Sequence, residues 1–446
     1  MLLYSHSSTP RLQYALQFIG SIVGQPFLLT TDIEAFTHSR DIKINYSEEK
    51  LHGVGYHIQP HTLLFQTTID PIEINIVQCR GNACFFTSKN DNHGFDVFAA
   101  IFYLLSRYEE YLPHEKDVYG RYAHINSVAY KNNFLALPVV NFWVQDLMRQ
   151  LQIADRELSI VNRQPVAVWG LTTDHSPFTF CPTYDIDIAY AYRYQPLWKN
   201  VGGFFKDLAN GNFEKLMERA NVYSGTKPDP FDVYDWLHTM HKHYQLSPVY
   251  FFLLAKKRGI YDRNISPRVK GMQQLVKKHA AKYKVGIHPS WQSGDEDGLL
   301  VEEIKSLQHI TQQPCIFSRQ HYIRLTLPKT YRALISTGIT EDYSMGYGSI
   351  NGFRASVASP FFWYDLERDE ATKMLLRPFC YMEANSFFEQ HFSAEEAAEE
   401  LQQYHDVVKQ AGGQLVTICH NHFLTTQPQW EPWRKMYAAF LKKNFS

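Results

Sequence analysis

The chain has 446 residues, which is long enough for two or three domains with sizeable cores. Acidic and basic side chains almost cancel, giving a net charge of −1. A nucleic-acid-binding protein is expected to carry a basic excess or stripe, so this composition argues against nucleic acid as a partner. Aromatic residues are abundant, with 28 Tyr and 30 Phe. Such rings line sugar-binding sites but more often fill cores.

The amino terminus lacks the basic stretch and uninterrupted apolar segment of a signal peptide. No stretch approaches the roughly 18 apolar residues that a membrane span needs. The six Cys residues contain no CxxC pair and predict neither a disulfide framework nor a zinc ribbon. We therefore expect a reduced, cytoplasmic protein.

The first part of the chain mixes short strand-like runs with helices. Residues 50–66 and 72–79 are rich in β-branched residues and predict strands. The apolar run from Phe95 to 112 predicts a buried helix, and residues 139–151 predict a second one. We expect a smaller α+β domain over 1–165. Asp117, Arg121 and His124 follow the buried helix and are candidate contacts with the second domain, which the first would shape or cover.

From about residue 178 the pattern alternates between strand and helix, which predicts an α/β domain over 175–446 with a mainly parallel sheet, open or closed into a barrel. Ser393 and Glu396 form a predicted capping box, and that helix is expected to end at Gly412-Gly413. The predicted strands end at polar residues. These are Asp185, Asp187, His288, Arg319 and His420. The carboxyl edge of such a sheet is where ligands bind, so we expect these side chains to share one site.

Each of these residues has chemistry suited to a hydrolytic site. Two close carboxylates, Asp185 and Asp187, repel unless a cation lies between them, which favours one on a metal and the other free as a base. A neutral imidazole such as that of His288 is a common metal ligand. Arg319 would orient a carboxylate, with Asp342 as another possible partner. His420 could donate a proton to a leaving group.

The stretches TYDIDIAY, GIHPSW, SRQHYIRL, GFRAS and ICHNHF, in this order, resemble the polysaccharide deacetylases of the NodB-homology superfamily, carbohydrate esterase family four. With FDVFAAIFYLLSRYEEYL and YGRYAHINS, most of the chain is similar to a two-domain bacterial group of polysaccharide deacetylase family proteins. The resemblance implies a distorted (β/α) barrel of the NodB type after the amino-terminal domain.

The resemblance also implies roles. Asp185 would be the general base, Asp187 and His288 metal ligands, Arg319 the residue that orients the base, and His420 the general acid. The family has a second ligand His where this chain has Gln292, and it has Pro where this chain has His321. His321 is therefore the candidate for the missing imidazole. The family's partner for the acid His is not recognisable in the sequence.

We therefore expect a metal-dependent enzyme that removes N- or O-acetyl groups from a carbohydrate, with a divalent metal, zinc by default, on Asp187, His288 and His321. Tyr322, Trp291 and Arg354 are the candidate substrate contacts, and the Tyr322 amide is a candidate oxyanion donor. Two alternatives stay open. The fold could be a non-catalytic carbohydrate-binding module, or DID could be the DxD motif of a metal-dependent glycosyltransferase.

Overall fold

The computed structural model describes residues 1–51, 55–161, 178–196, 212–296 and 298–446. The first part of the chain contains six strands and five helices within these ranges. The strands are β1 (Leu2–Tyr4), β2 (Leu28–Thr30), β3 (Lys43–Asn45), β4 (Tyr56–His57), β5 (Val77–Cys79) and β6 (Asn82–Cys84). The helices are α1 (Pro10–Val23), α2 (Ile33–His38), α3 (Val97–Leu105), α4 (Val128–Lys131) and α5 (Val139–Val161), with short 3-10 turns η1 (Thr62–Leu64), η2 (Tyr108–Glu110) and η3 (His124–Asn126).

The second part carries the larger sheet. Its strands are β7 (Thr179–Ile186), β8 (Val249–Leu253), β9 (Lys284–His288), β10 (Phe317–Ser318), β11 (Glu341–Asp342), β12 (Phe361–Asp365), β13 (Glu370–Leu376), β14 (Tyr381–Met382) and β15 (Gln414–His420). The helices are α7 (Phe213–Tyr223), α8 (Tyr234–His243), α9 (Lys270–Ala280), α10 (Leu299–Thr311), α11 (Lys329–Ser336), α12 (Ala394–Ala411) and α13 (Glu431–Phe445). Short turns are η4 (Gln292–Gly294), η5 (His321–Ile323), the π-helical η6 (Asn385–Glu389) and η7 (Asn421–Leu424).

The nine strands of the larger sheet follow the order β12-β13-β11-β10-β9-β8-β7-β15-β14. Every neighbouring pair is parallel except the hairpin of β12 and β13. The predicted alternation and parallel sheet are therefore confirmed. The expected closed barrel is not found among the described strands, because β12 and β14 form the two ends and do not pair with each other. The antiparallel hairpin occupies one end, where a barrel would need another parallel strand.

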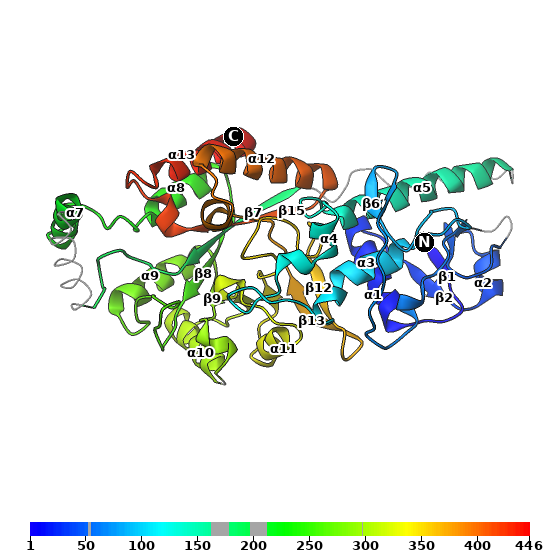
Figure 1. Ribbon diagram of the computed structural model, residues 1–446, viewed down its shortest axis with the longest axis horizontal. Helices are drawn as coiled ribbons and strands as arrows, with labels where there is room; N and C mark the ends of the chain where they lie inside the picture. The colour runs from blue at the N-terminus through cyan, green and yellow to red at the C-terminus, as the bar shows by residue number, and fades with distance from the viewer. Residues whose placement is uncertain (52–54, 162–177, 197–211, 297) are drawn as a thin grey trace.

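The buried central strands show why this sheet forms. All five residues of β8, the run Val-Tyr-Phe-Phe-Leu, are buried. Such continuous apolar runs are typical of parallel strands covered on both faces. Helix α12 begins with the predicted capping box, in which Ser393 and Glu396 bond each other's backbone, and Gly412 ends it in a left-handed conformation. Figure 1 shows α12 and α13 together along one side of β7 and β15.

Four of the amino-terminal strands form a separate parallel sheet in the order β2-β1-β3-β4, and β5 pairs with β6. Helix α3 is fully buried, as expected, and begins at Asp96, whose carboxylate accepts from the amides of Phe98 and Ala99. The prediction of strands over the whole of residues 50–66 and 72–79 is wrong. Among the described residues of these runs, only Tyr56–His57 and Val77–Cys79 form strands, each in a short pairing with one neighbouring strand.

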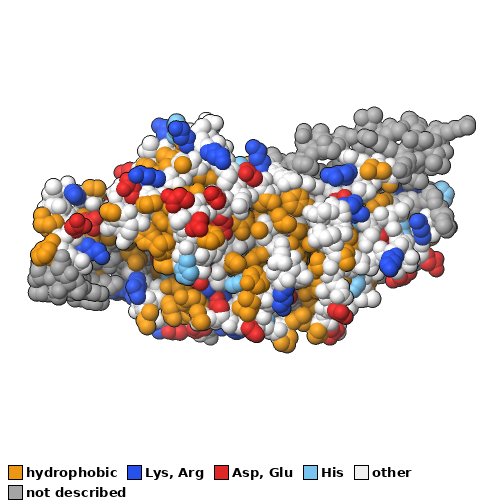
Figure 2. Space-filling model, turned by 45° about the horizontal axis from the view of Figure 1, so that its top comes forward, with side chains coloured by type: hydrophobic (Ala, Val, Ile, Leu, Met, Phe, Trp, Pro, Cys, Tyr) orange, Lys and Arg blue, Asp and Glu red, His pale blue; other side chains and the backbone are white. Residues whose placement is uncertain are grey.

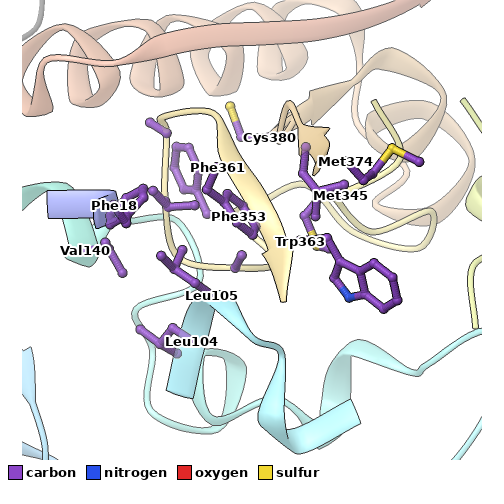
Figure 3. Packing of buried hydrophobic residues seen from close by; sticks show 14 of the residues in the cluster. Phe18, Leu104, Leu105, Val140, Met345, Phe353, Phe361, Trp363, Met374 and Cys380 are labelled. Carbon is purple, nitrogen blue, oxygen red and sulfur yellow. The ribbon is translucent and has the colours of Figure 1, made fainter. Parts of the chain in front are cut away.

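The two parts share one hydrophobic core, which runs from Leu3 to Leu441. The ring of Tyr14 in α1 lies 5.0 Å from that of Tyr364 in β12, and Phe18 lies 6.5 Å from Phe361. Figure 3 shows Phe18 of the first part close to Phe361 of the second. The hairpin of the larger sheet is thus covered by amino-terminal helices. The expected domain boundary, between residues 165 and 175, lies outside the described residues.

Two findings bear on the expectations about cysteines and membranes. Cys79 and Cys84 form a disulfide across the hairpin of β5 and β6, so the expectation of fully reduced thiols is wrong for this pair. The hairpin brings the two Cα atoms to 6.0 Å, a separation that permits the bond. Within the described ranges, no helix has the length and apolarity needed to span a bilayer.

Candidate functional site

The site lies at the carboxyl edge of the larger sheet. Asp185 is in β7 and Asp187 follows its last residue, so the two side chains leave the strand on the same side. His288 ends β9, and His420 ends β15. Because these strands are parallel, their carboxyl ends meet at one edge, and the structure brings the four side chains together there.

His288 is fixed in one orientation by a backbone contact. Its Nδ1 atom lies 2.6 Å from the carbonyl oxygen of Arg319, so Nδ1–H donates there. This leaves the lone pair on Nε2, which lies 3.3 Å from Oδ1 of Asp187 and 3.7 Å from Oδ2 of Asp185. An imidazole whose second nitrogen bonds a carbonyl group is typical of metal-ligating histidines.

His321, the first residue of the turn η5 after strand β10, is held in a similar way. Its Nδ1 lies 2.9 Å from a carboxylate oxygen of Asp262, which is 1% exposed and also accepts from the Trp291 amide. Its Nε2 lies 3.5 Å from Oδ2 of Asp187. In many zinc sites a carboxylate binds one nitrogen of a histidine whose other nitrogen binds the metal. Asp262 and His321 have the first part of this arrangement.

The ligand atoms of Asp187, His288 and His321 all lie within 4.8 Å of one another. Oδ1 of Asp187 lies 3.3 Å from Nε2 of His288, and Oδ2 lies 3.5 Å from Nε2 of His321, so each imidazole faces one oxygen of the carboxylate. Oδ1 of Asp187 is buried and makes no hydrogen bond to any described residue. The donor set and this unpaired oxygen both fit a divalent cation.

The electrostatics of the three groups are complementary. Burial alone would raise the pKa of Asp187, but the charge of His321 and the closeness of the His288 and His321 imidazoles lower it well below its usual value. Burial alone would lower the pKa of His321, but Asp187 and Asp262 raise it to about 9. The two carboxylates thus favour the charged form of His321, and a cation that binds Nε2 would compete with a proton for that nitrogen.

Arg319 is fully buried and holds Asp185. Its Nη1 donates to Oδ1 of Asp185 at 2.9 Å and to the hydroxyl of Thr183 at 2.6 Å, while Nε donates to the carbonyl oxygen of Tyr343 at 3.0 Å. Its guanidinium lies 4.6 Å from the ring centre of Phe251. Asp342, the other suggested partner, instead accepts from Ser318 and Ser344, so that suggestion is wrong.

His420 faces Asp187 from the carboxyl end of β15. Its Nδ1 lies 2.9 Å from Oε1 of Glu383, which follows β14 and is 2% exposed, and its Nε2 lies 3.7 Å from Oδ2 of Asp187. Burial alone would lower the pKa of His420, but Glu383 and Asp187 raise it to about 10. His420 is therefore placed to carry a proton at Nε2.

A pocket of about 670 Å³ is lined by Asp185, Asp187, His288, His321 and His420. Tyr322 lines it, as do Tyr119 and Arg121 from the amino-terminal part. Arg121 donates to the carbonyl oxygen of Tyr322 at 2.8 Å, and His124 bonds Ser349 at 2.9 Å, so two of the three candidate residues contact the second part, whereas Asp117 binds Arg121. On the face shown in Figure 2, histidine and acidic side chains lie among hydrophobic ones toward the middle of the molecule.

Two predicted substrate contacts lie outside the pocket. Arg354 is 1% exposed and pairs with Glu110 at 2.6 Å and 2.8 Å, so it joins the two parts of the chain instead of meeting a ligand. Trp291 stacks behind the pocket residue Tyr261, with ring centres 4.2 Å apart. Gln292 also lies outside the residues that line the pocket.

Sequence reasoning missed two buried carboxylates. Asp262 lies in the segment after β8, 59 residues before His321, and Glu383 lies 37 residues before His420. It also missed His422, which lines the pocket beside His420 and whose pKa burial lowers to about 3. A carboxylate directly after a short strand, as in YME, was the available signal for Glu383.

Comparison with known proteins gives two kinds of likeness. A family of unknown function (DUF7033) matches residues 1–155. No curated protein matches. A crystal structure from Mycobacterium smegmatis, provisionally described as a polysaccharide deacetylase, is 11% identical with a TM-score of 0.38, covering 60% of this chain and 85% of that one.

Two further solved structures are similar at the same level. The polysaccharide deacetylase from Bacillus cereus is 12% identical with a TM-score of 0.29, covering 59% of this chain and 87% of that one. The 4-alpha-glucanotransferase from Thermococcus litoralis is 9% identical with a TM-score of 0.36, covering 60% of this chain and 38% of that one.

Proposed function

We propose that this protein is a metal-dependent deacetylase that removes N- or O-acetyl groups from a carbohydrate. The observation that carries the proposal is the grouping of Asp187, His288 and His321, whose ligand atoms lie within 4.8 Å of one another. Each imidazole has its Nδ1 held by a hydrogen-bond acceptor, the carbonyl oxygen of Arg319 or the carboxylate of Asp262, which directs both Nε2 atoms toward Asp187 and the proposed cation.

A divalent cation, with zinc as the proposed ion, would be held by these three residues and would supply Lewis acidity toward a water molecule and an acetyl carbonyl. A set of one carboxylate and two imidazoles suits zinc and leaves a coordination position for a substrate or water. Gln292 is not part of this proposed set. His321 supplies the second imidazole, which the family has at the position of Gln292.

Asp185 is proposed as the general base. Arg319 binds Oδ1 of Asp185, while Oδ2 faces the site, 3.7 Å from Nε2 of His288. The buried guanidinium fixes the orientation of the carboxylate, and the second oxygen stays available to accept a proton from an attacking water. Asp185 and Asp187, although two residues apart, therefore have separate tasks.

His420, the register partner of Asp185 on the neighbouring strand β15, is proposed as the general acid. Glu383 holds Nδ1, so the proton on Nε2 points toward Asp187 and the pocket. An amine or alkoxide is a poor leaving group unless it is protonated as it departs, and this imidazole can supply that proton. The backbone amide of Tyr322, which lines the pocket, is the proposed donor to the carbonyl oxygen that becomes negative.

The test is acetate release from acetylated chito-oligosaccharides by the purified full chain with added zinc. We expect release that is lost in Asp187→Ala and Asp185→Asn, whereas Asp235→Asn, at an exposed carboxylate on α8, behaves as wild type. Activity unchanged in Asp187→Ala would remove the metal-ligand assignment. Zinc and sugar binding without acetate release from the wild type would replace the proposal with a carbohydrate-binding module.

A further inference from the structure

One wall of the pocket comes from the amino-terminal part of the chain. The turn from Asp117 to Arg121 is 201 residues before Tyr322 in the sequence, yet Tyr119 and Arg121 line the same pocket as Tyr322. This turn belongs to residues 1–155, which match the family of unknown function. None of the proposed catalytic residues lies in that segment.

The turn is held rigidly by its own residues. Oδ1 of Asp117 accepts from the amides of Tyr119 and Arg121 at 3.0 Å and 2.9 Å. Gly120 adopts a left-handed conformation with φ of 74°, and its amide bonds the carbonyl oxygen of Asp117 at 2.8 Å. These contacts fix the backbone from which the ring of Tyr119 extends into the pocket.

Arg121 fixes the turn against the site. Its Nη1 donates to the carbonyl oxygen of Tyr322, and its guanidinium lies 4.8 Å from the ring centre of Tyr119. The guanidinium passes over Gly348, where a Cβ atom would lie 2.1 Å from Nη1. The position of Tyr119 is thus coupled to the turn that carries the metal-binding residue His321.

The aromatic rings form a continuous surface that leads outward from the proposed metal site. The ring of Tyr322 lies 4.7 Å from that of His321 and 5.3 Å from that of Tyr119, which in turn lies 6.2 Å from Tyr261. At the mouth of the pocket Tyr261 is 36% exposed and Ile260 is 77% exposed. Large apolar side chains exposed beside a polar pocket are typical of ligand-binding surfaces.

We propose that Tyr119 and Tyr261 form a binding subsite for the sugar residue next to the acetylated one, so that the substrate is an oligosaccharide or polysaccharide chain. This inference rests on the proposed function. The C–H faces of a sugar ring pack on aromatic rings, and Tyr119 and Tyr261 supply such rings beside the polar site. The amino-terminal part then has a defined task, which is to complete the substrate pocket.

The experiment measures binding by calorimetry in the full-length, zinc-loaded Asp185→Asn variant, which cannot turn over the ligand. The probes are N-acetylglucosamine and its β-1,4-linked tetramer. Tyr119→Ala is compared with Tyr119→Phe, which keeps the ring, and with Tyr130→Ala, which removes an exposed tyrosine of α4 outside the pocket. Melting curves of each variant show whether it is folded.

We expect Tyr119→Ala to weaken binding of the tetramer by about fivefold to tenfold and to leave binding of the monomer unchanged. Tyr119→Phe and Tyr130→Ala should bind both probes as the parent does. Equal affinity of Tyr119→Ala and the parent for the tetramer would overturn the subsite, as would equal losses for the two probes or no binding of the tetramer by the parent.

The subsite and the proposed reaction can fail separately. Tetramer binding that depends on Tyr119, without acetate release by the wild-type chain, would support the subsite and remove the deacetylase. Acetate release by the wild type, with tetramer binding that does not depend on Tyr119, would overturn the subsite and leave the deacetylase in place.

Discussion

Nδ1 of His321 lies 2.9 Å from a carboxylate oxygen of Asp262, and both side chains are buried. This contact directs Nε2 of His321 toward Asp187, at 3.5 Å. The chain has Gln292 where the resembling family has its second ligand histidine. In the proposed metal site, the pair of Asp262 and His321 supplies the second imidazole.

Replacing Asp262 by Asn is expected to weaken zinc binding. An amide accepts a hydrogen bond from the imidazole less strongly than a carboxylate does. His321 should therefore be less firmly oriented and less basic. Loss of such an outer partner typically reduces metal affinity by about 10-fold to 100-fold. Competition with a fluorescent zinc chelator measures the change. Asp235→Asn, at an exposed carboxylate, serves as the control, and an unchanged affinity in Asp262→Asn would contradict the role of this pair.

Replacing His420 by Ala is expected to affect substrates according to their leaving groups. An N-acetyl sugar needs a proton on its departing nitrogen, so its kcat should fall by about 10²-fold to 10⁴-fold. The nitrophenolate of p-nitrophenyl acetate leaves without protonation and should be affected much less. Glu383→Gln should give the same pattern in a milder form, because Glu383 only positions His420. Equal losses on the two substrates would argue against a general acid at this position.

The buried pair of Glu110 and Arg354 predicts an acid-sensitive connection between the two parts of the chain. Burial alone would raise the pKa of Glu110, but Arg354 and Arg107 lower it from 4.5 to about 2. Because the folded pKa lies below the unfolded one, the stabilisation is present above pH 4.5 and is lost as the pH falls toward 2. Its size is about 3 kcal/mol.

Urea unfolding at several pH values tests this prediction. The free energy of unfolding of Glu110→Gln should be lower than that of the wild type by about 3 kcal/mol near neutral pH, because the buried guanidinium of Arg354 loses its carboxylate partner and that of Arg107 keeps only Glu109. The difference should shrink as the pH falls below 4.5. Glu399→Gln, at an exposed residue of α12, should follow the wild type. A difference that stays constant with pH would contradict the lowered pKa.

Local sequence pattern was enough to place the main side chains of the site. Asp187, His288 and His420 each follow an apolar run that is readable as a buried strand, and parallel strands bring such ends together. The capping box of α12 was predictable for the same reason, because both of its residues are close in sequence.

Features that depend on distant partners could not be read in this way. Glu383 and Asp262 act on histidines 37 and 59 residues away, and no local pattern links them. Arg354 was assigned to the substrate, but its partner Glu110 is 244 residues away. Whether the sheet closes is also a question of pairing between distant strands, which alternation of strands and helices does not determine.

The metal content of the protein tests the central claim most directly. Wild type, His321→Ala and His309→Ala, a variant at an exposed histidine of α10, are incubated with zinc, separated from free ion by gel filtration and analysed by mass spectrometry. We expect stoichiometric zinc in wild type and His309→Ala, and a large loss in His321→Ala. Equal zinc in wild type and His321→Ala, or none in the wild type, would contradict the claim.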